Sequence, residues 1–173
     1  GVHAVHTKIE ALCLALDGDR HGPAWEFIYK PITQADDNQN VRFKEARNAL
    51  RKLFGVYSRR ELTTIGHKKV FVKEIGESLT HENRLALALN MGNAANISRI
   101  REGHGWTDDQ ISAALRSLTK RDWEFVQSVW DYLETFRDES FALQEAVTGM
   151  RPRAVEPQPL TVQTAEGQTL NLR

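Results

Sequence analysis

Apolar residues recur every three or four positions along most of the chain, which is the spacing of an amphipathic helix. The clearest pattern follows Thr119, where two adjacent apolar stripes form one broad face. The stripes are Trp123, Val126, Trp130, Leu133 and Phe125, Val129, Tyr132, Phe136. So broad a face is typical of a helix packed by two or more neighbours. No proline interrupts the pattern before Gly149, so one long helix is predicted, with a kink allowed near Asp138.

Helix start signals come in series in the middle of the chain. Thr80 opens a segment that is apolar nearly all round until Gly92, which predicts a central helix. Asn93 is placed to cap the next helix, which is expected to end at Gly103. Two further helices carry both a capping box and a hydrophobic staple at their start. These signals are formed by Thr107, Gln110, Trp106, Ile111 and by Thr119, Asp122, Leu118, Trp123.

The N-terminal half gives weaker signals. Residues 3–16 predict a helix that ends at Gly18, and a short segment from Trp25 to Tyr29 precedes Pro31. Residues from about 35 to 54 predict another helix, with Gly55 as its stop. Its apolar face is formed by Phe43, Ala46, Leu50 and Leu53. Two shorter helices are predicted at 58–65 and 67–75.

The pattern changes after Gly149, where prolines at 152, 157 and 159 end the helical spacing. Residues 160–172 then alternate apolar and polar side chains around a glycine turn, which predicts a β-hairpin. The predicted domains are a helical domain at 1–150 and a proline-rich connection with a hairpin at 151–173. An isolated hairpin is marginal in water, so it either packs on the helices or belongs with strands of a longer protein from which this segment is truncated.

The predicted fold class is therefore all-α: a multi-helix bundle or array of about six to eight helices with a short C-terminal β-hairpin. The 173 residues are 40% apolar and 27% charged, which allows a folded core. Their formal net charge is zero, so overall charge indicates no partner. The single cysteine, Cys13, lies in an apolar run and is interpreted as an inert buried thiol. No membrane span and no signal peptide are predicted in this segment.

No catalytic, cofactor or metal site is predicted from motifs. His3 and His6 form a pair at helical spacing, but two histidines are too few for a zinc site. Leu85 stands where a zinc-protease motif beginning at His81 needs its second histidine. No phosphate-binding glycine loop and no serine-hydrolase elbow occur. An uncharacterised enzyme remains an alternative, and its candidate groups are His81, Glu82, His104, Asp108 and Asp109.

Charge is unevenly distributed. Residues 41–73 carry ten basic side chains and two acidic ones, an excess of eight positive charges. Lys44, Arg47 and Arg51 recur at three and four positions, on the side of their helix predicted to lie opposite its apolar face. Such a stripe can contact DNA phosphates, or it can pack against acidic parts of the protein. The candidate nucleic-acid contacts are Lys44, Arg47, Arg51, Arg59 and Arg60.

An ordered set of sequence runs resembles a helical region of very large proteins of tailed bacteriophages and prophages. These proteins are often described as large polyvalent or ejected virion proteins. The runs are LDGDRHGPAWEFIYKPITQADD at 16–37, LTHENRLALALNMGNAANISRI at 79–100, GWTDDQISAALRSLTKRDWEFVQSVWDYLETF at 105–136 and ALQEAVTGMRPRAVEPQPL at 142–160. None of them carries a catalytic signature.

The resemblance implies a biological context. It implies a non-enzymatic structural or interaction domain that acts in virion assembly, in delivery with the genome, or as a scaffold for neighbouring domains. The implied partners are other domains of a parent protein or virion proteins, and the implied location is the virion or the host cytoplasm. A nucleic-acid-binding module and an enzyme domain remain the two alternatives.

Overall fold

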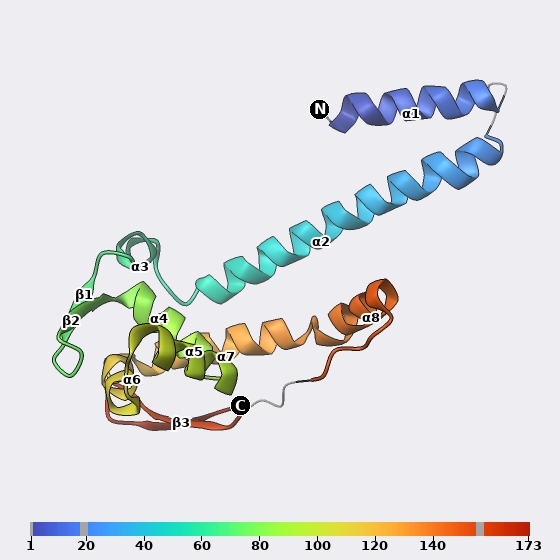
Figure 1. Ribbon diagram of the computed structural model, residues 1–173. Helices are drawn as coiled ribbons and strands as arrows, with labels where there is room; N and C mark the ends of the chain where they lie inside the picture. Colours follow the sequence, from blue (N-terminus) through green and yellow to red (C-terminus); the bar gives the residue numbers. More distant parts are fainter. Residues whose placement is uncertain (1, 18–20, 155–157) are drawn as a thin grey trace. The chain divides into compact units, whose positions relative to one another are not determined.

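The computed structural model describes residues 2–17, 21–154 and 158–173, with backbone alone for 2–6 (Figure 1). The chain divides into two compact units, Gly1–Lys52 and Leu53–Arg173. The boundary falls near the end of a helix, and the hairpin of residues 151–173 belongs to the second unit.

The first unit contains two helices joined by a tight connection. Helix α1 spans Val2–Leu16, a π-helical turn η1 spans Trp25–Tyr29, and α2 spans Lys30–Phe54, which crosses the unit boundary. The Asp17 carboxylate secures the connection by accepting hydrogen bonds from the backbone N–H groups of Gly22, Ala24 and Trp25, at 2.8 to 3.0 Å. The helix predicted at 3–16 is confirmed.

Helix α2 begins earlier than the sequence indicated. The sequence predicts its start near residue 35, after Pro31. Pro31 is instead the second residue of α2. The π-helical turn directly precedes α2, so the hydrogen-bond pattern already departs from the α-helical one where Pro31, which has no N–H, enters the helix. The segment from Trp25 to Tyr29 leads into α2 without a break.

The second unit is mostly helical and ends in an antiparallel hairpin, so the predicted fold class is confirmed. Its elements are α3 (Arg59–Thr64), β1 (Lys69–Val72), β2 (Glu77–Thr80), α4 (His81–Asn90), α5 (Ala94–His104), α6 (Asp108–Leu115), α7 (Lys120–Glu134), α8 (Arg137–Thr148), β3 (Leu160–Gln163) and β4 (Thr169–Leu172). Strands β1 and β2 form one two-stranded sheet and β3 and β4 form the other.

The predicted helix caps are present. Thr80 caps α4, Asn93 caps α5, and Thr107 and Thr119 open α6 and α7 with complete capping boxes. Helix α5 runs on to His104, one residue past the predicted stop. Its C-cap is Gly105, which has a φ of 67° that a glycine adopts without strain.

The helix predicted at 67–75 is wrong. Residues 69–72 form β1, which pairs with β2 so that Val70 lies opposite Leu79 and Val72 opposite Glu77. The segment is short and rich in β-branched and aromatic side chains, which favour a strand. Gly76, with a φ of 80°, allows the turn between the strands, and Val72 and Leu79 bury one face of the hairpin.

The long helix predicted after Thr119 is interrupted, close to the position near Asp138 where a kink was allowed. Helix α7 ends at Glu134 and α8 starts at Arg137. At the break, the N–H groups of Thr135 and Phe136 donate to carbonyls three residues back, at 3.2 and 3.1 Å. Such bonds tighten the last turn of a helix. The apolar stripe consequently does not continue as a buried face.

The core of the second unit is built around the start of α7. Leu118, Trp123 and Val126 are completely buried there. Helix α4 packs against α6, α7 and β2, as its apolar sequence predicted. The C-terminal hairpin joins this core: Leu172 is buried, and the Ala165 N–H donates to the Leu118 carbonyl at 2.8 Å. Within the described ranges, no helix has the length and apolar character to cross a bilayer.

We expect Leu118→Ala to lower the free energy of unfolding of the second unit by about 2–5 kcal/mol, because a buried leucine leaves a cavity that the core fills only in part. Chemical denaturation followed by tryptophan fluorescence measures the change. Leu133→Ala is the control, because Leu133 is exposed and its loss should cost under about 0.5 kcal/mol. If both variants lost the same free energy of unfolding, Leu118 would not belong to the core of the second unit.

Candidate functional site

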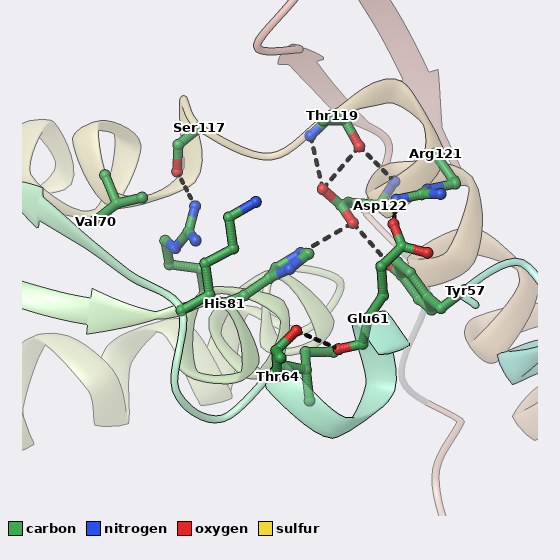
Figure 2. A pocket seen from close by; sticks show the side chains of 12 residues that line it. Tyr57, Glu61, Thr64, Val70, His81, Ser117, Thr119, Arg121 and Asp122 are labelled. Carbon is green, nitrogen blue, oxygen red and sulfur yellow. Dashed lines mark hydrogen bonds and ion pairs between the residues drawn. The ribbon is translucent and has the colours of Figure 1, made fainter. Parts of the chain in front are cut away.

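A buried carboxylate lies at the start of α7. Asp122 is 2% exposed and accepts four hydrogen bonds (Figure 2). Two come from Thr119, from its backbone N–H at 2.9 Å and its hydroxyl at 2.8 Å. The Tyr57 hydroxyl donates at 2.7 Å, and the His81 Nε2 lies 3.0 Å away. Asp122 therefore does more than close the capping box that its position predicted.

Three distant segments meet at this carboxylate. Tyr57 lies between α2 and α3, His81 is the first residue of α4, and Asp122 is in the first turn of α7. The Tyr57 ring is buried, edge-on to Phe125 at 5.3 Å between ring centroids. The Arg121 guanidinium lies over the same ring at 5.1 Å from its centroid. These contacts hold the tyrosine hydroxyl toward Asp122.

The electrostatics of the cluster favour a charged aspartate and a neutral tyrosine. Burial raises the pKa of Asp122, but the hydrogen bonds from Thr119 and Tyr57 lower it by more than burial raises it. The pKa of Asp122 is therefore below its ordinary value of 3.8. Burial, together with the hydrogen bond to Asp122, raises the pKa of Tyr57 far above its ordinary value. Tyr57 thus remains a hydrogen-bond donor at neutral pH.

A second carboxylate at the site, that of Glu61, accepts hydrogen bonds from two neighbouring residues. The backbone N–H of Ser58 and the Arg121 guanidinium both donate to Glu61, which lowers the pKa of this carboxyl to about 2. The ion pair between Arg121 and Glu61 joins α7 to α3 at 2.5 Å. Both carboxylates of the site are therefore already engaged by donors of the chain.

A cavity of about 200 Å³ lies beside the cluster. The side chains that line it include Lys68, His81, Arg84, Ser117 and Arg121. Three hydroxyl groups of the lining are engaged within the chain. Thr64 donates to backbone carbonyls, Ser117 accepts from Arg84 and Thr119 donates to Asp122, so none of the three is bonded to a histidine base in the described part of the chain.

The candidate enzyme residues from the sequence do not converge. His81 lines the cavity, whereas His104 is stacked on Trp106 at 4.7 Å and lines a different pocket. Asp108 forms an ion pair with Arg101 at 2.6 Å. Glu82 and Asp109 are exposed. Tyr57 and Arg84 were not predicted as site residues, because their side-chain partners Asp122 and Ser117 lie far away along the chain.

The candidate nucleic-acid contacts lie in both units. All five side chains are exposed, and none forms an ion pair in the described part of the chain: Lys44, Arg47, Arg51, Arg59 and Arg60. Three of them are on α2 and two on α3. Lys44 and Arg47 line a shallow depression together with Asn40 and Phe43. These two basic residues therefore border the apolar position Phe43, and do not lie opposite it as the sequence indicated.

The remaining candidate residues from the sequence are the histidine pair His3 and His6, as metal ligands, and Cys13. No three His, Cys, Asp or Glu side chains gather as metal ligands among the residues described here. The side chains of His3 and His6 lie outside the described ones. Cys13 is buried, as predicted.

Comparison of the chain with protein-family models, with curated proteins and with solved structures gave no match.

The stabilising effect of Asp122 should depend on pH. Because its pKa is lower in the folded chain, its contribution is full above pH 3.8 and is lost as the pH falls through the folded value. At pH 7 we expect Asp122→Asn to lose about 1.5–3 kcal/mol of unfolding free energy, since hydrogen bonds to a charged group are removed. Urea denaturation between pH 7 and 2 should show this deficit shrinking below pH 3.8.

The control is Asp109→Asn, because Asp109 is exposed and stands at the start of a helix without a buried partner. Its loss should cost no more than about 1 kcal/mol. A deficit for Asp122→Asn that stays constant down to pH 2 would contradict the lowered pKa.

Proposed function

We propose that the chain is a non-enzymatic structural and protein-interaction domain. The observation that carries this proposal is an apolar stripe on α2 that is left uncovered. Phe43 and Leu50, which the sequence assigned to a buried helix face, are 65% and 48% exposed. An exposed apolar stripe on a stable helix is typical of a protein-binding surface.

The stripe belongs to a unit with little core of its own. Among the described side chains of the first unit, at 7–17 and 21–52, Cys13 is the only buried one. Large apolar side chains are instead exposed along both helices and the connection: Leu12, Leu16, Phe27, Ile28, Ile32, Val41, Phe43 and Leu50. A pair of helices gains most of its stability from packing its apolar faces, so this unit is suited to packing against a partner.

The charges beside the stripe indicate what kind of partner fits. Lys44 and Arg47 border Phe43, and Arg51 follows one turn later on the same helix. An apolar surface rimmed by basic groups is complementary to an apolar protein surface rimmed by acidic ones. We therefore assign the stripe to a protein partner with acidic side chains around an apolar strip.

The satisfied polar groups of the second unit support a non-enzymatic role. Asp122 and Glu61 are engaged by donors of the chain, and in the described lining the hydroxyls of Thr64, Ser117 and Thr119 are not bonded to a histidine. The phage or prophage context follows from the sequence resemblance alone. In that context the partner would be another domain of a parent protein or a virion protein, met during assembly or delivery with the genome.

Nucleic-acid binding is the second candidate, and the exposed basic side chains favour it. Lys44, Arg47 and Arg51 lie on one helix and have no acidic partner in the described part of the chain. Free basic groups of this kind can neutralise backbone phosphates. The apolar residues between them have no role in such a contact, which is why the protein partner ranks first.

Two synthetic amphipathic helices test the proposal. Both carry the same leucine stripe, which one flanks with glutamates and the other with lysines. We expect the acidic peptide to bind this chain more tightly, by at least about tenfold in fluorescence anisotropy. Phe43→Ser/Leu50→Ser should weaken the binding of both peptides by removing the apolar contacts, and Lys44→Glu/Arg47→Glu should reverse the preference.

The matched control is Val147→Ser, which removes an exposed apolar side chain from α8 and should change nothing. Fluorescent duplex DNA provides the rival ligand, at about 50 and 200 mM salt. DNA binding that weakens steeply with salt and is lost in Arg47→Glu/Arg51→Glu, with neither peptide bound, would replace the protein-interaction proposal by the nucleic-acid one.

A further inference from the structure

The geometry points to the cavity beside Asp122 as a binding site for a small phosphate ligand, either inorganic phosphate or a phosphomonoester. This site is separate from the stripe on α2 and does not depend on the proposed function. Four features of the second unit support it: a buried arginine, a lysine without an ion pair, two helix starts, and carboxylates that are already engaged.

Arg84 is the principal observation. It belongs to α4 and lines the cavity, yet it is only 3% exposed. Its Nε donates to the Thr80 carbonyl at 3.3 Å and its Nη1 to the Ser117 hydroxyl. No carboxylate lies within ion-pair distance of it in the described part of the chain, although a buried charge is costly unless an opposite charge or several hydrogen bonds compensate it. An anion in the cavity would supply that charge.

Lys68 provides a second cation at the same cavity. It lies between α3 and β1, lines the cavity and forms no ion pair within the described ranges. Arginine and lysine bind a phosphate through different interactions. The planar guanidinium can donate two parallel hydrogen bonds, and the ammonium supplies a mobile point charge. Together they match the charge and the several acceptor oxygens of a phosphate group.

The helices add to the positive potential. Helices α4 and α7 both begin at the cavity, with His81 and Thr119 among its lining residues. The N-terminus of a helix carries a partial positive charge that favours anions. His81 Nε2 is already directed at Asp122, as Figure 2 shows, so it is not needed as a phosphate ligand.

The acidic groups of the cavity offset only part of this field, because Lys68, Arg84 and Arg121 stand against the two carboxylates Glu61 and Asp122. Asp122 is surrounded by four donors, and Glu61 is paired with Arg121. This leaves Arg84 and Lys68 as the cations without a carboxylate partner in the described lining. The volume of about 200 Å³ is below the range of roughly 300–1,000 Å³ typical of drug-sized ligands. It suits a phosphate group and little more.

Titration of the chain with inorganic phosphate and, separately, with glycerol phosphate tests this assignment. Calorimetry gives the affinity, and thermal unfolding shows the linked gain in stability. We expect each ligand at about 10 mM to raise the unfolding midpoint above that in chloride of equal ionic strength. The two titrations also distinguish free phosphate from a phosphomonoester, because the preferred source binds more tightly.

Two neighbouring lysines provide a matched pair of variants. Lys68→Gln should weaken phosphate binding by about tenfold or more, the loss of one charged contact. Lys69→Gln, on the adjacent residue outside the cavity lining, should leave the affinity unchanged. Arg84→Gln should abolish binding, and its unfolding curve without ligand shows whether the variant still folds.

The assignment is overturned if phosphate stabilises the chain no more than chloride does. It is equally overturned if the Lys68→Gln and Lys69→Gln variants bind phosphate with the same affinity, because binding would then reflect general surface charge.

Discussion

The second unit depends on the compensation of one buried charge. The Asp122 carboxylate is out of water, so its charge is tolerated only while Thr119, Tyr57 and His81 remain bonded to it. These partners come from the start of α7, the segment before α3 and the start of α4. A shift of any of these segments would leave a buried charge with too few donors. The cluster therefore fixes their positions in a way that apolar packing alone does not.

The two units differ in whether their apolar side chains are buried. In the second unit, apolar side chains from α4, α6, α7 and the C-terminal hairpin share one core. In the first unit, apolar positions recur along α2 but remain exposed. An apolar stripe of this kind lowers its free energy by association. The same hydrophobic effect thus yields a core in one unit and leaves an apolar stripe exposed in the other.

Local signals allowed much of the fold to be predicted. Thr107 and Thr119 were identified as helix starts because a capping box lies within four residues. Long-range pairing was harder to predict. The predicted helix at 67–75 covers strand β1 of the hairpin, since a short apolar run fits both periods. The break after Glu134 was missed because no proline or glycine marks it.

The candidate site was only partly predictable for the same reason. Asp122 was identified by its capping position, and His81 by its place at a helix start. Tyr57 and Arg84 carry no local motif, and their partners lie 65 and 33 residues away. The exposure of Phe43 could not be predicted either, because periodicity identifies an apolar face without indicating what covers it.

A double-mutant cycle between Tyr57→Phe and Asp122→Asn tests the central role of the Asp122 cluster most directly. Denaturation of the parent, the two single variants and the double variant gives the coupling free energy between the two side chains. The buried hydrogen bond between them predicts a coupling of about 1–3 kcal/mol. Additive losses, with a coupling near zero, would show that Asp122 does not hold Tyr57 in place and that apolar packing alone joins these segments.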